Sequence, residues 1–267
     1  MSRSGPDAPV RWHLLREPDG RPGWRQMAAD RALLDLAVRE GVVVLRLYRW
    51  DPFCLSFGAH EPAERRYDRE RIAALGLDTV RRPTGGRAVW HARELTYAVV
   101  GPERVFGPLR EAYLTIHRIL ADALRRLGAA PDFAPDPGRA APLDAGPCFA
   151  RPAGGEVLVG GSKVVGSAQV RLGDAFLQHG SVLLEDDQAL VGAVAREPAA
   201  AGGEIPLARA LGRPVSWAAT ATAAADAFAE WAGGPPVPWS GATHEAFLAA
   251  ATGHEPQFRS PEWTWRR

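Results

Sequence analysis

The sequence predicts a single α+β domain with a mixed or antiparallel sheet flanked by helices. Three observations lead to this fold class. The chain has 267 residues, which is enough for one substantial core. Short segments with strand-like alternation concentrate before residue 185, and segments with helical periodicity flank or follow them. No period of 20–50 residues repeats in the sequence, so a solenoid is excluded.

The composition is that of a folded globular protein. Hydrophobic residues make up 46% and charged residues 24% of the chain, which excludes wholesale disorder and fibrous repeats. The net charge of +1 offers no bulk attraction to nucleic acid or to anionic lipid. The sequence contains neither an apolar run of 18 residues nor the order of charged and apolar segments of a signal peptide. We therefore expect a cytoplasmic protein that binds neither nucleic acid nor membrane.

The first half of the chain alternates between helices and strands. Four prolines among polar residues predict a mobile leader over residues 1–23, with at most one short strand near 12–15. Apolar residues at helical spacing predict a helix over 26–39 that ends at Gly41. The segments that follow are predicted as strands at 42–48 and 53–57, a helix at 68–75, strands at 79–82, 88–90 and 95–100, and a long helix at 109–127.

The second half begins with a loop over 129–155 that is rich in proline and alanine. A loop of more than 20 residues is either disordered or functional. Strands are predicted at 157–159, 163–171 and 175–184, with a tight hairpin turn at Gly173 and Asp174, and helices at 187–194, 207–211, 222–231 and 244–251. These elements predict one folded domain over 24–255 and a C-terminal tail over 256–267.

Lysine is nearly absent from the sequence, since the 32 basic residues include only one, Lys163. An ammonium group is compact and can lose its proton when it is buried, whereas a guanidinium group cannot. Lys163 opens a predicted strand in which Gly166, Ser167 and Ala168 are all small, which leaves space for a ligand against the backbone. An ordinary solvated charge is the alternative, and the run of small residues argues against it.

The two cysteines are too few for a disulfide framework. Cys54 alternates with apolar residues in a predicted strand, so we expect a small buried hydrophobic residue. Cys148 lies in the long loop and is a candidate nucleophile. Lys163 follows it by fifteen residues, which is enough chain to fold back and bring a cation to the thiolate.

Two further segments carry candidate binding residues. The motif Arg-Arg-Pro-Thr-Gly-Gly-Arg over 81–87 joins two strands, and its paired glycines let backbone N–H groups approach an anion or a thioester. A purely structural turn is the alternative. His179 lies inside a strand, where a histidine is more often a satisfied core residue than a catalytic base. No cluster of histidine and cysteine has the spacing of a metal site, so we expect no metal.

Three motifs in order resemble the biotin/lipoate protein ligase catalytic-domain superfamily. More narrowly, they are similar to its octanoyl-acyl-carrier-protein:protein octanoyltransferases of the Gram-positive type, over about residues 27–250. The motifs are Arg-Arg-Pro-Thr-Gly-Gly-Arg-Ala-Val with Glu-Leu-Thr-Tyr (81–97), Gly-Ser-Lys-Val-Val-Gly-Ser-Ala-Gln (161–169) and Leu-Gln-His-Gly-Ser (177–181).

This resemblance implies a reaction, partners and site residues. The reaction is octanoyl transfer in lipoate biosynthesis, from octanoyl-acyl carrier protein to the acceptor lysine of a lipoyl domain such as a glycine-cleavage H protein. Cys148 would be the nucleophile that forms the acyl-thioester, and Lys163 would stabilise its thiolate and transfer a proton. We expect a monomer that needs no cofactor. The residues implied in substrate binding are Arg82, Gly85, Gly86, His91, Gly166, Ser167, Ala168, His179 and Gly180. The arginines at 81, 82 and 87, together with Arg65 and Arg66, are candidates for docking acidic partners; for Arg65 and Arg66 an ordinary solvated surface is the favoured alternative.

Three other functions stay open at this point. Lipoate ligases of the same superfamily activate free lipoate with ATP, but they typically carry a longer glycine run where this chain has Arg87. An octanoyl amidotransferase, which moves the group between two lipoyl domains, uses similar cysteine chemistry and is poorly separated by motifs. A non-enzymatic acyl-binding homologue is the third alternative, and the joint presence of the loop cysteine, the lysine and the small-residue strand argues against it.

Overall fold

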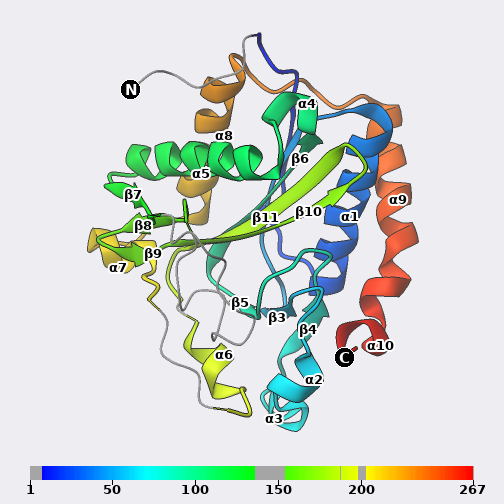
Figure 1. Cartoon of the computed structure of the whole chain (residues 1–267), viewed down its shortest axis with the longest axis vertical. Coiled ribbons are helices and arrows are strands. Elements are labelled where there is room, and N and C mark those ends of the chain that lie inside the picture. The colour runs from blue at the N-terminus through cyan, green and yellow to red at the C-terminus, as the bar shows by residue number, and fades with distance from the viewer. Residues whose placement is uncertain (1–7, 136–153, 187, 198–202, 267) are drawn as a thin grey trace.

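The computed structural model describes residues 8–135, 154–186, 188–197 and 203–266 (Figure 1). The predicted α+β class is confirmed: a mixed sheet of five strands lies between helices. Its order is β1-β2-β6-β11-β10, with only the β1–β2 pair parallel. The strands are β1 (His13–Arg16), β2 (Val44–Tyr48), β6 (Glu94–Pro102), β10 (Val165–Leu172) and β11 (Ala175–Leu183).

Strand pairing aligns one row of residues across four strands of this sheet. Gly166 on β10 pairs with Ser181 on β11, which pairs with Thr96 on β6, which pairs with Tyr48 on β2. Neighbouring strands lie about 4.8 Å apart. The row therefore spans roughly 14 Å, and it underlies the site described below.

Helices cover both faces of the main sheet. Side chains alternate along each strand, so Leu45, Tyr97 and Val99 face α5 (Leu109–Arg126) and α8 (Trp217–Ala232). Val44, Ala98 and other alternate residues pack on α1 (Gly23–Glu40) and α9 (Gly241–Arg259), which lie side by side (Figure 1). The core therefore consists of two apolar layers, one on each face of the sheet.

Two small sheets complete the description. One has the order β4-β3-β5 and the other β7-β8-β9. Their strands are β3 (Cys54–Phe57), β4 (Asp78–Arg81), β5 (Val89–His91), β7 (Pro131–Phe133), β8 (Val157–Val159) and β9 (Ser162–Lys163). The short helices are α2 (Ala63–Arg66), α3 (Arg69–Ala74), α4 (Glu103–Phe106), α6 (Ala189–Ala193), α7 (Leu207–Leu211) and α10 (Pro261–Thr264). No helix in the described ranges has the length and apolar character needed to cross a bilayer.

Local chemistry explains where the main helices begin and end. Gly41 stops α1 because it adopts φ 64° and its N–H binds the carbonyl of Ala37. The α8 helix begins five residues before the predicted start, since the Ser216 hydroxyl accepts from the N–H of Ala219 and caps it. The part of the long predicted loop nearest α5 forms β7, which pairs with β8. Residues 136–153 of that loop lie outside the described residues.

Described segments near both ends of the chain pack into the fold. The short strand expected near 12–15 is β1, and Trp12 beside it is fully buried, with its indole N–H 2.9 Å from the carbonyl of Gly234. Near the other end, the buried Arg81 guanidinium donates to the carbonyl oxygens of Trp263, Thr264 and Arg266. The residues from Trp12 to the start of α1 and those of α10 are therefore part of the fold.

Candidate active site

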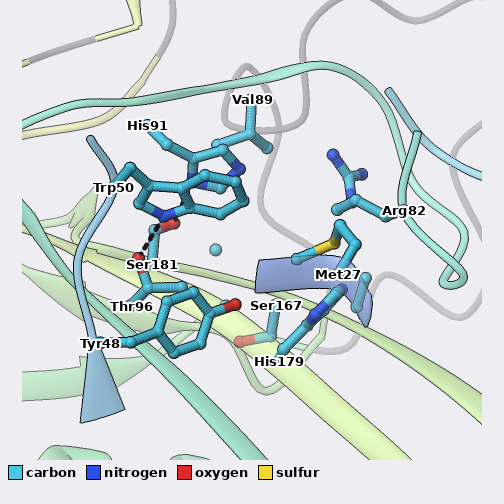
Figure 2. Close-up of a pocket in the computed structure, with 13 residues that line it drawn as sticks. Met27, Tyr48, Trp50, Arg82, Val89, His91, Thr96, Ser167, His179 and Ser181 are labelled. Carbon is cyan, nitrogen blue, oxygen red and sulfur yellow. Dashed lines mark hydrogen bonds between the residues drawn. The ribbon is translucent and has the colours of Figure 1, made fainter. Parts of the chain in front are cut away.

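A pocket lies above the aligned row of the main sheet (Figure 2). The space between its lining atoms, including the part open to solvent, is about 340 Å³. Seven of the nine residues implied in substrate binding line it, whereas Gly85 and Gly86 do not. The lining residues are Met27, Tyr48, Trp50, Arg82, Val89, His91, Thr96, Gly166, Ser167, Ala168, His179, Gly180 and Ser181.

His179 is held between two elements that are far apart in sequence. Its Nδ1 lies 2.7 Å from the Asp30 carboxylate on α1, and its Nε2 lies 2.6 Å from the Thr84 hydroxyl. Because a carboxylate only accepts, Nδ1 carries the proton and Thr84 donates to Nε2. Burial lowers the pKa of His179, and the bond to Asp30 opposes that change without reversing it. His179 is thus a neutral residue that ties the 81–87 turn to α1.

Asp30 is itself fixed by an ion pair beneath the pocket. Arg46 Nη1 lies 2.7 Å from Asp30 Oδ1, both side chains are fully buried, and the Tyr48 hydroxyl donates to Asp30 Oδ2 at 3.0 Å. Burial disfavours the charged carboxylate, but Arg46 and His179 hold its pKa below the usual value. Burial and the Asp30 charge raise the pKa of Tyr48 well above its usual value. Asp30 is therefore a buried anion that organises the pocket floor.

A second network runs through His91. Its Nε2 lies 2.6 Å from the Ser56 hydroxyl and its Nδ1 lies 2.7 Å from Glu94 Oε1. This is the order of a serine, histidine and carboxylate triad. Ser56, however, is fully buried, does not line the pocket, and accepts from Arg82 Nη1 at 2.7 Å. The network therefore orients His91 and Arg82 instead of supplying a nucleophile.

Arg82 fixes the turn with paired glycines through hydrogen bonds to the backbone of that turn. Its Nη2 donates to the carbonyl oxygens of Gly85 and Arg87, at 3.1 and 2.8 Å. A Cβ on Gly58 would lie 1.9 Å from the carbonyl oxygen of Gly86, so the turn packs directly against the Gly58 backbone. Gly86 adopts φ 87°, a conformation that favours glycine. These contacts describe a rigid turn.

The expectation that Arg81 and Arg82 dock acidic partners is wrong. Arg81 is fully buried and Arg82 is 4% exposed. Both guanidinium groups donate to backbone carbonyls of the fold, Arg81 to Gly58 and Glu61 among others. A charge enclosed in this way offers no surface to a partner protein. The sequence could not distinguish these arginines from solvated ones.

Lys163 is a buried cation with a buried anionic partner. Its side chain is fully buried, and Nζ lies 2.6 Å from Oε1 of Glu156, the residue immediately before β8. The alternative of a solvated lysine is therefore wrong. Lys163 precedes Gly166, the first pocket residue of β10, by three positions. Cys148, the predicted nucleophile, lies outside the described residues.

Ser167 takes part in a chain of hydrogen bonds on the α5 face of the sheet. Its hydroxyl lies 2.6 Å from the Tyr97 hydroxyl and 2.8 Å from His117 Nε2. His117 Nδ1 faces the carbonyl of Gly155 at 2.7 Å, so it donates there, and Nε2 accepts from Ser167. Burial lowers the pKa of His117 to about 4 and raises that of Tyr97 to about 12. The Ser167 hydroxyl is thus engaged in positioning β10 on α5.

Cys54 is the buried residue that the sequence predicted. It is fully enclosed in β3, and burial, followed by the charge of Asp78, raises the pKa of its thiol well above the usual value. A protonated buried thiol is a poor nucleophile. Among the described residues, no group of three histidine, cysteine, aspartate or glutamate side chains converges as metal ligands would.

Sequence reasoning missed four charged or titratable residues that shape the site. Two of them carry a signal in retrospect, because Asp30 interrupts the apolar face of a helix and Arg46 interrupts an apolar strand. The other two, His117 and Glu156, offered no comparable pattern, since their partners lie elsewhere in the chain. Glu94 was part of a quoted motif, but its bond to His91 was not predicted.

The comparisons with known proteins agree with this fold. Residues 22–229 match the lipoyl protein ligase A/B catalytic domain, and the chain belongs to that family. Octanoyltransferase LipM of Kyrpidia tusciae is 45% identical over 197 residues, which are 70% of this chain and 71% of the relative. Octanoyltransferase LipM of Symbiobacterium thermophilum is 39% identical over 235 residues, which are 82% and 85% of the two chains.

Solved structures confirm the fold. A T. acidophilum protein with bound lipoic acid superposes with a TM-score of 0.77 at 21% identity, covering 96% of this chain and 100% of that one. Lipoate-protein ligase A bound with ATP superposes with a TM-score of 0.74 at 20% identity, covering 96% and 99%.

Proposed function

We propose that this chain is an octanoyltransferase of lipoate biosynthesis that acts through a cysteine thioester. The observation that carries the proposal is the buried Lys163–Glu156 pair, whose lysine precedes the pocket residue Gly166 by three positions. It sits in a chain whose relatives at 39–45% identity are named octanoyltransferases. The only lysine of the sequence precedes the pocket residue Gly166 by three positions, which supports a role for its charge next to the pocket.

The pocket takes the acyl chain in this proposal. Met27, Trp50 and Val89 supply apolar surface, and the polar groups around them bond to one another. Each methylene group transferred from water to such a surface contributes about 0.8 kcal/mol. An octanoyl chain therefore has enough apolar surface to bind without a charged anchor.

Transfer proceeds in two acyl-transfer steps. The Cys148 thiolate attacks the thioester carbonyl of octanoyl-acyl carrier protein, a carbon–sulfur bond to Cys148 forms, and the bond to the carrier sulfur breaks to release the carrier thiolate. The acceptor lysine of a lipoyl domain then attacks the Cys148 thioester. A carbon–nitrogen bond forms, the bond to Cys148 breaks, and a proton of the amine passes through Lys163 to the departing sulfur.

The partners in this proposal are octanoyl-acyl carrier protein and a lipoyl domain, and the enzyme acts in the cytoplasm as a monomer. Supply of different acyl donors tests it. An apo lipoyl domain should be acylated from octanoyl-acyl carrier protein without ATP, Cys148→Ser should abolish the reaction, and Cys54→Ala should retain it. Acylation from free octanoate with ATP and Mg²⁺ that tolerates Cys148→Ser would indicate a ligase. Acylation only from an octanoylated lipoyl domain would indicate an amidotransferase.

A further inference from the structure

Trp50 stands at one end of the pocket. The pocket follows the aligned row from Gly166 on β10 to Tyr48 on β2, about 14 Å at the usual strand spacing. Lys163 precedes Gly166, the residue at the β10 end of the row, by three positions. Trp50 follows Tyr48 by two residues, and its indole, which lines the pocket, bonds to Thr96, the third residue of the row, two strand spacings or about 10 Å from Gly166.

The Trp50 indole is held on three sides. Its Nε1 donates to Thr96 Oγ1 at 2.7 Å, and its ring stacks on His91 with 4.1 Å between centroids and 15° between planes (Figure 2). Its Cζ3 would lie 3.2 Å from a Cβ at Gly23, so the glycine at the start of α1 leaves room for the ring. Trp50 is 3% exposed. The Trp50 side chain is therefore held in one position at the boundary of the pocket.

Polar groups surround the Trp50 indole on the side away from the pocket. Glu94 Oε1 accepts from Thr96 at 2.6 Å, and Glu94 also lines a second cavity together with Arg49 and Trp217. Arg49 is the residue immediately before Trp50, and the Trp217 indole N–H faces the carbonyl of Tyr48 at 3.4 Å. An acyl chain that passed the indole would meet buried or charged polar groups, which is unfavourable for a methyl terminus.

We propose that Trp50 sets the upper limit of the acyl chain length that the enzyme accepts. This inference rests on the proposed function, in which the acyl carbonyl lies toward Lys163 and the chain runs along the row. Seven carbon–carbon bonds in an extended zigzag span about 9 Å. An eight-carbon chain that starts near β10 then ends against the indole, and each further methylene group must displace it.

The test uses acyl carrier protein loaded with chains of eight, ten and twelve carbons. In the wild-type enzyme, kcat/KM for the twelve-carbon donor should be at least about tenfold below that for the eight-carbon donor. Trp50→Leu should raise the twelve-to-eight ratio about fourfold for each further methylene group that the enlarged pocket accommodates. Trp50→Phe, which removes less volume, should raise it less. Trp24→Leu, a partly exposed tryptophan of α1 outside the pocket, is the matched control and should leave the ratio unchanged.

Two results would overturn the inference. One is an equal wild-type kcat/KM for the eight-carbon and twelve-carbon donors. The other is an unchanged twelve-to-eight ratio in a folded Trp50→Leu variant that still transfers the octanoyl group. If thermal melting shows that Trp50→Leu does not fold, the wild-type comparison and Trp50→Phe decide. Failure of the proposed function is distinct, because the wild-type enzyme would then transfer no acyl group from the carrier at all.

Discussion

Replacing His117 by glutamine should make the protein less sensitive to acid. His117 is fully buried, donates through Nδ1 to Gly155 and accepts through Nε2 from Ser167. Its pKa is lowered to about 4 by burial, against about 6.5 for a histidine in an unfolded chain. The unfolded state therefore binds more protons between these two values. Stability is fully present above about pH 6.5 and is lost as the pH falls toward 4.

The size of the effect follows from the two pKa values. Between pH 7 and pH 5 the linkage relation gives a loss of about 2 kcal/mol from this residue. Glutamine can make both hydrogen bonds and does not ionise, so His117→Gln should lose about 2 kcal/mol less than the wild type over the same interval. His179, whose pKa is also lowered by burial, contributes equally to both proteins and cancels.

Urea unfolding at pH 7, 6 and 5 measures this difference directly. The exposed His244 provides a matched control, because His244→Gln should keep the acid sensitivity of the wild type. If His117→Gln loses as much stability as the wild type, within about 0.5 kcal/mol, then His117 does not remain neutral through that range and the assignment of its hydrogen bonds is wrong.

Three further changes test the packing of the site. Asp30→Ala leaves the buried Arg46 without its fully buried anionic partner and should destabilise the protein by about 3 kcal/mol in urea unfolding; a loss under 1 kcal/mol would contradict a buried pair. Gly58→Ala places a methyl group on the carbonyl of Gly86 and should cost about 2 kcal/mol, with octanoyl transfer reduced; unaltered stability and activity would contradict a rigid turn. Cys54 should react with iodoacetamide only after denaturation, and rapid labelling of Cys54 in the native protein would contradict its burial.

Much of the fold follows from local patterns. Apolar spacing and Gly41 predicted α1, the turn at Gly173 and Asp174 predicted the β10–β11 hairpin, and helix α7 was predicted at its observed bounds. Periodicity depends only on residues that are close in sequence, so it can be recognised without knowledge of the fold. The extra turns of α8 at its start depend on the Ser216 cap, which the predicted boundary missed.

The candidate site was predicted in part. Gly166 and Ala168 line the pocket, as small residues on a strand beside Lys163 suggested. The bonds that position them could not be predicted, since Asp30 and His179 lie 149 residues apart in sequence and meet only through packing of α1 on β11. Arg81 shows the same limit, because nothing in an Arg-Arg pair reveals that its side chain is enclosed by carbonyl groups.

Intact-mass measurement after mixing the enzyme with octanoyl-acyl carrier protein, without an acceptor, tests the central claim most directly. The wild-type protein should gain about 126 Da, one octanoyl group in place of a hydrogen, and hydroxylamine should remove it. Cys148→Ser should gain no hydroxylamine-sensitive mass, and Lys163→Arg should gain it far more slowly, because a guanidinium group cannot replace the buried ammonium. An adduct of the same mass and lability on Cys148→Ser would contradict the account.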